Sequence, residues 1–77
     1  MKERVLQVLR DYKSAVDYEK ETALISGGII DSMEWVELIE KLEKAFQVTI
    51  PLEQLTAENF NSADAIVALM EELTKNA

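Results

Sequence analysis

An all-α fold is predicted for this chain: a small four-helix bundle with three main helices, one short helix and a long first loop. Apolar residues recur at the three- and four-residue spacing of amphipathic helices in three stretches of the sequence. The one candidate strand, Val48-Thr49-Ile50, is too short to be predicted as such. The chain has no Cys and no His, so neither disulfides nor the usual zinc sites can stabilise it. We therefore expect the fold to be stabilised by packing of helices around aliphatic side chains.

The length of 77 residues corresponds to one small domain, because domains typically take roughly 100 to 200 residues. We therefore expect a single domain over residues 1–77. Hydrophobic residues make up 48% and charged residues 30% of the chain, a balance typical of globular proteins and not of disordered ones. A core this small seldom also encloses a desolvated catalytic site, so a self-contained enzyme is not expected.

The first helix is expected from Lys2 to about Val16. Its apolar residues fall at helical spacings and comprise Val5, Leu6, Val8, Leu9, Tyr12 and Val16. Over residues 17–31 this periodicity fades, and Gly27-Gly28 interrupts it, which predicts a long loop. Loops of about 15 residues without secondary structure are uncommon in compact domains unless they are functional. We therefore expect the loop to pack against the helices and to matter for function.

The second helix has the clearest start signal in the chain. Asp31 can cap it while Glu34, three residues on, reaches back, and Ser32 then takes the first helical position. At about 100° per residue, one arc of this helix is apolar. That arc comprises Trp35, Leu38, Ile39, Leu42, Ala45 and Phe46. Met33 and Val36 fall outside the arc, among the acidic residues, and are predicted to be exposed.

The remaining elements follow Pro51, which ends the second helix together with Val48 and Ile50. Three apolar residues, Leu52, Leu55 and Phe60, indicate a short helix of one or two turns. Asn61 or Ser62 can cap a last helix that runs to Lys75. Its apolar face comprises Ala65, Ile66, Leu69, Met70 and Leu73.

The charge of the chain restricts its partners. The formal net charge is −7, and residues 21–77 hold eleven acids and three bases, a net charge of −8. Phosphate backbones would repel such a surface, so nucleic acid is not an expected partner, whereas basic patches on proteins would be attracted. No apolar run approaches the roughly 20 residues of a membrane span, and no signal peptide is recognised. We expect a cytoplasmic monomer.

Catalytic and metal-binding constellations are not expected. Without His and Cys there is no imidazole base and no thiolate nucleophile. The acids Glu34, Glu37, Glu40 and Glu43 follow a three-residue step that does not form a calcium-binding loop, so we interpret them as a solvated acidic face. Gly27-Gly28 is a turn signal and not a phosphate-binding loop.

One hydroxyl group has an unusual position. Ser32 follows a capping Asp at the start of the clearest helix. The first turn of a helix presents unpaired backbone N–H groups and the positive end of the helix dipole, which favour a phosphate ester on that hydroxyl. By residue preferences alone, an Asp-Ser pair is also an ordinary helix start.

The sequence around this serine resembles the phosphopantetheine attachment region of the acyl carrier protein family. The resemblance covers roughly residues 24–73 and rests above all on Gly28-Ile29-Ile30-Asp31-Ser32-Met33, Val36-Glu37-Leu38-Ile39 and Leu42-Glu43-Lys44-Ala45-Phe46. The motif is similar to the family's Asp-Ser-Leu, with Met in place of Leu. Its form is most similar to free-standing carriers such as D-alanyl, polyketide and peptide-synthetase carriers.

The resemblance implies a carrier protein without catalytic activity of its own. Ser32 would be esterified by a phosphopantetheinyl transferase using coenzyme A, and the thiol of the 4′-phosphopantetheine arm would hold an acyl or aminoacyl group as a thioester. The partners would be this transferase, a loading ligase or acyltransferase, and downstream synthase or transferase enzymes. The positions that match the family's docking helix are Asp31, Met33, Glu34, Val36 and Glu37.

Two alternatives remain open from the sequence. A peptidyl or D-alanyl carrier would be loaded by an adenylating ligase, and an unmodified helical interaction module could keep the carrier fold. Trp35 stands where smaller residues are common in the family; we interpret it as a core residue, although its indole could instead fill space for an acyl chain.

Overall fold

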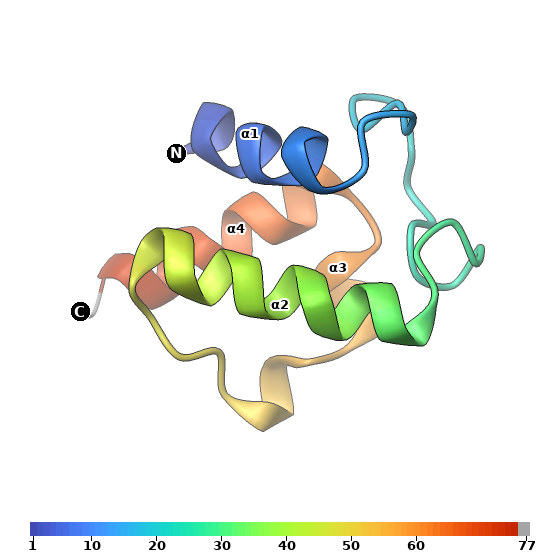
Figure 1. The fold of residues 1–77 in the computed structure, drawn as a ribbon. Helices are drawn as coiled ribbons and strands as arrows, with labels where there is room; N and C mark the ends of the chain where they lie inside the picture. Colours follow the sequence, from blue (N-terminus) through green and yellow to red (C-terminus); the bar gives the residue numbers. More distant parts are fainter. Residues whose placement is uncertain (76–77) are drawn as a thin grey trace.

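The computed structural model describes residues 1–75. Over that range it contains helices joined by loops and no strand (Figure 1). Residues 76–77, the end of the predicted domain, lie outside the described residues. The elements are α1 (Lys2–Tyr12), α2 (Ser32–Phe46), a 3₁₀ turn η1 (Leu52–Gln54), α3 (Ala57–Phe60) and α4 (Ala63–Lys75). The predicted bundle of three main helices, a short helix and a long first loop is therefore confirmed.

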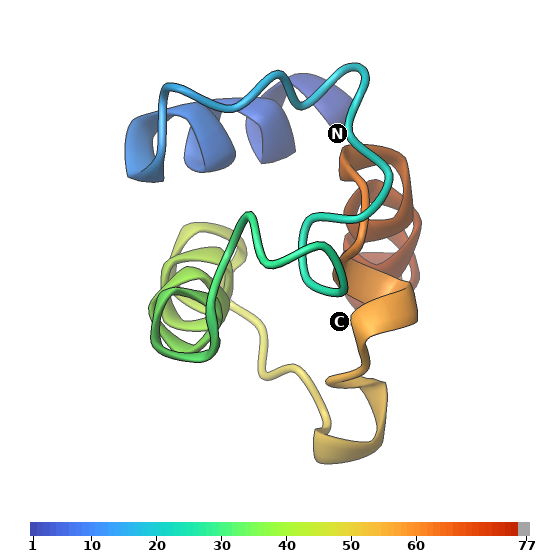
Figure 2. The ribbon, with the colours of Figure 1, turned by 90° about the vertical axis from the view of Figure 1, so that its right-hand side faces the viewer.

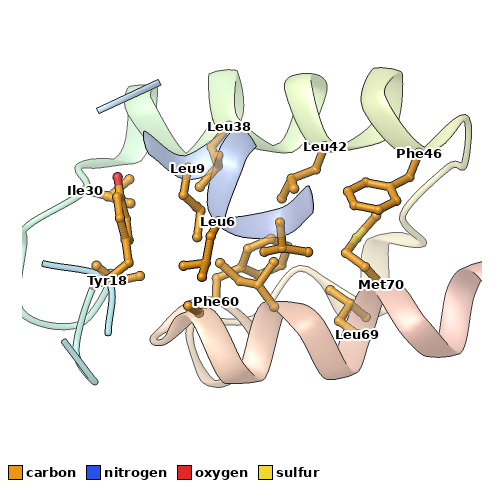
Figure 3. Packing of buried hydrophobic residues seen from close by; sticks show 14 of the residues in the cluster. Leu6, Leu9, Tyr18, Ile30, Leu38, Leu42, Phe46, Phe60, Leu69 and Met70 are labelled. Atoms are coloured by element: carbon orange, nitrogen blue, oxygen red, sulfur yellow. The ribbon is translucent and has the colours of Figure 1, made fainter. Parts of the chain in front are cut away.

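The three long helices surround one apolar core. Helix α1 packs against α2 and against α4, and the short α3 packs against α4 (Figures 1 and 2). Figure 3 shows the side chains of α2 pointing across the core toward those of α1, α3 and α4. The residues without any exposed surface include Val5, Leu9, Leu24, Leu38, Leu42, Phe60, Ile66 and Met70.

Helix α1 ends at Tyr12, four residues before the predicted end at about Val16. Lys13 leaves the helix with extended backbone angles of φ −144° and ψ 90°. The buried Tyr18 explains this early end, because its hydroxyl donates a hydrogen bond of 2.8 Å to the Lys13 carbonyl. A Lys13 carbonyl turned toward Tyr18 is not available to continue the helix.

The loop over residues 13–31 packs against the helices, as predicted. Leu24 and Ile30 are buried in the core, and the Ile30 N–H donates to the Leu24 carbonyl at 2.8 Å. Asn61 fastens the loop from the other side, since its side-chain oxygen accepts hydrogen bonds from the backbone N–H groups of Ile25 and Ser26 at 3.0 and 2.9 Å. The loop therefore reaches Ser32 from a fixed direction.

In the view of Figure 1, η1 lies below α2, and α3 and α4 lie behind it. The region predicted as one short helix is divided between η1 and α3, and the Thr56 hydroxyl caps α3 through Asn59 N–H. Of the two predicted caps of α4, Ser62 accepts the Ala65 N–H at 3.0 Å, because Asn61 is engaged with the loop.

Candidate functional site

The start of α2 is held by a reciprocal capping box, as the sequence predicted. The Asp31 carboxylate accepts the Glu34 N–H at 2.8 Å, and the Glu34 carboxylate accepts the Asp31 N–H at 3.0 Å. Two of the N–H groups that a helix start leaves unpaired are thereby satisfied. The residue enclosed by this box, Ser32, is the first residue of α2 and has a fixed backbone.

The Ser32 side chain is exposed to solvent. No side chain or backbone group among residues 1–75 forms a hydrogen bond with its hydroxyl. Its position in the first turn of a helix of 15 residues places the hydroxyl in the positive end of the helix dipole. The helix dipole at this position favours a phosphate ester on the hydroxyl.

Glu34 connects the capping box to the end of α1. Its carboxylate lies 3.0 Å from the Lys13 ammonium group, and the two side chains keep 30% and 32% of their surface exposed. The hydrogen bond from the Asp31 N–H, followed by that from Lys13, lowers the pKa of Glu34 below its ordinary value of 4.5. Glu34 therefore stays ionised, and bound to both groups, in mildly acidic solution.

We expect Glu34→Gln to reduce the stability of the fold at neutral pH and to matter less in acid. A carboxyl group with a lowered pKa stabilises the folded state above its unfolded pKa, and this contribution is lost as the pH falls through its folded pKa. Urea unfolding midpoints should therefore differ between wild type and variant near pH 7 and converge as the pH falls through the lowered folded pKa of Glu34.

Glu53→Gln is the matched control, because Glu53 is exposed in η1 and has no hydrogen bond or ion pair within the described part of the chain. Its midpoints should follow those of wild type at both pH values. If the difference in unfolding midpoint between Glu34→Gln and wild type stays the same in acid, the ionised carboxylate does not stabilise the start of α2.

The exposed apolar residues predicted on α2 are confirmed. Met33 keeps 78% and Val36 keeps 56% of its surface exposed. Both lie in the first two turns of the helix, beside Ser32. These two side chains therefore form an exposed apolar surface at the start of α2.

Glu37, on the same part of α2, is paired within the chain. The Tyr12 hydroxyl donates a short hydrogen bond to its carboxylate, and this bond raises the pKa of Tyr12. The Lys41 ammonium group lies 5.8 Å from the centre of the Tyr12 ring, within the range of a cation–π contact. The exposed Glu40 lies beside them on α2 and forms no hydrogen bond or ion pair within residues 1–75.

The structure thus brings the six predicted site residues together at one end of α2, and it adds two residues that the sequence did not indicate. The sequence predicts Tyr12 only as part of the apolar face of the first helix, and it assigns Lys13 no role at the site. Both contacts depend on where α1 ends and how it lies against α2. No local pattern in the sequence encodes them.

Trp35 packs at the edge of the core, as interpreted from the sequence. Its ring meets Phe60 of α3 edge to face, with centroids 5.6 Å apart. Its indole N–H is buried and has no hydrogen-bond partner within residues 1–75. The indole therefore occupies the space between the first half of α2 and the short α3.

Within residues 1–75, no group of His, Cys, Asp or Glu residues has a geometry that could hold a metal ion. No helix of that range is long and apolar enough to cross a membrane.

Comparisons with known proteins identify the family of the chain. The family model described as "Phosphopantetheine attachment site" matches residues 4–70. A D-alanyl carrier protein of Streptococcus suis is 32% identical over 74 residues, which are 95% of this chain and 94% of that protein. A D-alanyl carrier protein of Lactococcus lactis subsp. cremoris is 30% identical over 76 residues, 96% of each chain.

No match to a solved structure was found. The family match includes most of α1, the long loop, α2, α3 and most of α4, so it rests on nearly the whole fold and not on the serine motif alone. The chain therefore belongs to the phosphopantetheine-attachment family of carrier proteins, which hold a covalent 4′-phosphopantetheine and have no catalytic activity of their own.

Proposed function

We propose that Ser32 is the attachment site of the 4′-phosphopantetheine group. The observation that carries this proposal is an exposed, unbonded hydroxyl in the first turn of α2, inside the motif that resembles the family's Asp-Ser-Leu. In the transfer, the Ser32 oxygen loses its proton and bonds to the phosphorus atom that carries the pantetheine arm of coenzyme A. The pyrophosphate bond of coenzyme A breaks, and adenosine 3′,5′-bisphosphate leaves. The arm then supplies a terminal thiol, which the chain itself lacks.

Within this function, the protein provides a rigid base for a flexible arm. The capping box fixes Asp31 and Glu34 on either side of Ser32, so the arm starts from a defined position and direction. A tethered cargo remains at high local concentration near any enzyme that docks on the carrier. The chain thus presents the cargo, and its partner enzymes catalyse the reactions of that cargo.

We propose an aminoacyl cargo of the D-alanyl type, held as a thioester and loaded by an adenylating ligase. The support comes from relatives named D-alanyl carrier proteins that align over nearly the full length of the chain. The position of Trp35 against Phe60 agrees with a small cargo, because the indole occupies space next to the start of α2. An acyl cargo supplied by an acyltransferase is the alternative.

A loading assay distinguishes these cargoes. The phosphopantetheinylated protein is incubated with ATP, D-alanine and a D-alanine-activating ligase, and parallel reactions use L-alanine or a malonyl-transferring acyltransferase. We expect a mass gain of one alanyl group only with D-alanine, and its loss on treatment with hydroxylamine, which cleaves thioesters. Loading by the acyltransferase but not by the ligase would contradict the proposed cargo and leave the carrier function in place.

We propose that partner enzymes dock on the first two turns of α2, through Asp31, Met33, Glu34, Val36 and Glu37. The exposure of Met33 and Val36 supports this surface, and so does the net charge of −7, which favours basic partners. We further propose that residues 1–77 act as a single domain, as a monomer and in the cytoplasm. The single core over the described residues supports the first of these three statements.

Charge reversal by Glu37→Lys should slow phosphopantetheinylation about fivefold at low salt, because a basic partner loses attraction to this face. The deficit should shrink as salt is added, since mobile ions screen exposed charges. Initial rates of transfer from labelled coenzyme A provide the measurement.

Tyr12→Phe is the control for this variant. It removes the hydrogen bond to Glu37 but leaves the carboxylate charge unchanged, so its rate should stay near that of wild type. An equal rate deficit in both variants would assign the effect to the lost Tyr12 contact and would count against docking through Glu37.

A further inference from the structure

A single ammonium group holds the chain on both sides of Ser32. The Nζ atom of Lys13 donates to the Ile29 carbonyl at 2.7 Å, three residues before the serine. It also lies 3.1 and 3.0 Å from the two carboxylate oxygens of Glu34, two residues after the serine. The ammonium group therefore donates both to the backbone before Ser32 and to the carboxylate after it.

Lys13 itself starts from a fixed backbone. Its N–H donates to the Leu9 carbonyl at 2.9 Å, and its carbonyl accepts the hydroxyl of Tyr18 at 2.8 Å. Tyr18 is only 2% exposed and belongs to the core (Figure 3). Tyr18 therefore fixes the backbone of Lys13 to the core, and the Lys13 ammonium group holds residues 29–34 through Ile29 and Glu34.

The segment would be weakly held without this contact. Ile30 is buried and its N–H is bonded within the loop, but the carbonyl of Ile29 has Lys13 as its hydrogen-bond partner. The capping box fixes Asp31 to Glu34 but does not connect α2 to the end of α1. Lys13 connects the capping box to the end of α1, because Glu34 accepts from Asp31 and from Lys13 at the same time. The hydrogen bond from Tyr12 to Glu37 joins the same two helices further along α2.

An ion pair at this degree of exposure contributes little to global stability. The two side chains keep 32% and 30% of their surface in contact with solvent. The expected role of Lys13 is therefore local: it selects one conformation of the residues around Ser32.

We propose that Lys13 is a positioning residue for the modification of Ser32. Its ammonium group holds residues 29–34 in the conformation that the modifying enzyme binds. This proposal rests on the proposed function, in which Ser32 receives the 4′-phosphopantetheine group. When only a fraction of the molecules has the competent conformation, the apparent affinity falls by that fraction while the rate at saturation is preserved.

The test measures initial rates of transfer from fluorescently labelled coenzyme A over a range of carrier concentrations. For Lys13→Met we expect the KM for the carrier to rise about fivefold and kcat to stay within about twofold of wild type. Electrostatic attraction alone predicts the opposite change, a lower KM for the Lys13→Met variant. Removal of a cation makes a chain of net charge −7 more acidic and should lower the KM for a basic partner.

Lys20→Met is the matched control, because Lys20 is an exposed base of the same loop; its KM should equal or fall below that of wild type. Lys13→Arg retains charge and donors and should restore the KM to within about twofold of wild type. Lys13→Gln replaces Lys13→Met in the comparison if the methionine variant does not fold.

A KM for Lys13→Met at or below the wild-type value, or a Lys13→Arg variant as impaired as Lys13→Met, would overturn the positioning role. If wild type itself fails to accept the label while an unrelated carrier is modified in the same mixture, the proposed function fails instead. The two failures are therefore distinguishable.

Discussion

Replacement of Ser32 by alanine is expected to abolish phosphopantetheinylation and to leave the fold unchanged. The substitution removes the hydroxyl that we propose as the attachment point. It removes no hydrogen bond within the described chain and no buried surface, because the side chain is exposed. Incorporation of labelled coenzyme A should fall to background, while the far-UV circular dichroism spectrum should match that of wild type.

Ser26→Ala is the matched control for this experiment. Ser26 is also exposed and lies in the loop that precedes α2, six residues before Ser32. A transferase that modifies any accessible serine would therefore lose part of its labelling in both variants. We expect Ser26→Ala to be labelled as wild type is. Labelling of Ser32→Ala at the wild-type level would exclude Ser32 as the attachment site.

Leu38→Ala is expected to cost about 2 to 5 kcal/mol of unfolding free energy. Leu38 has 0% of its surface exposed and points from α2 into the core (Figure 3). Truncation there removes apolar contacts and leaves a cavity that the surrounding helices fill only in part. Chemical denaturation monitored by circular dichroism provides the measurement, with the slope against denaturant as a check on two-state behaviour.

Leu52→Ala removes the same atoms from a side chain that is 82% exposed. Its cost should stay within about 0.5 kcal/mol. Comparison of Leu38→Ala with Leu52→Ala therefore distinguishes the cost of lost core packing from any effect of replacing an exposed leucine by alanine. Equal and small losses in both variants would show that α2 does not present Leu38 to the core.

The start of α2 could be predicted from the sequence because its determinants are local. Asp31 and Glu34 bond each other's backbone across three residues, so their spacing alone predicts the capping box. The exposure of Met33 and Val36 also followed from the helical projection, since position on one helix decides which side faces solvent. These features lead to the candidate attachment site directly.

The end of α1 and the choice of cap for α4 could not be predicted in this way. Both are decided by contacts between residues distant in the sequence. Asn61 is separated by 36 residues from Ile25, the backbone of which it holds, and this leaves Ser62 as the cap. The early end of α1 depends on the packing of Tyr18, which occupies the core from a loop where no periodicity predicts burial.

The same reason explains why Lys13 and Tyr12 were missed as neighbours of the site. Their partners, Glu34 and Glu37, lie 21 and 25 residues further along the chain. Each contact requires the end of α1 to lie beside the first turns of α2, which only the packed structure specifies. Sequence patterns thus indicated Ser32 as the candidate attachment residue, and the fold revealed the contacts of Lys13 and Tyr12 with the helix that begins at Ser32.

The most direct test of the central claim is an intact-mass measurement on the wild-type protein. The chain is incubated with coenzyme A, Mg²⁺ and a permissive phosphopantetheinyl transferase, and an unrelated carrier is modified in the same tube as a positive control. We expect a gain of one phosphopantetheinyl group, located by peptide mapping on the peptide that contains Ser32. No gain while the control carrier is modified, or a gain on a peptide without Ser32, would contradict the account.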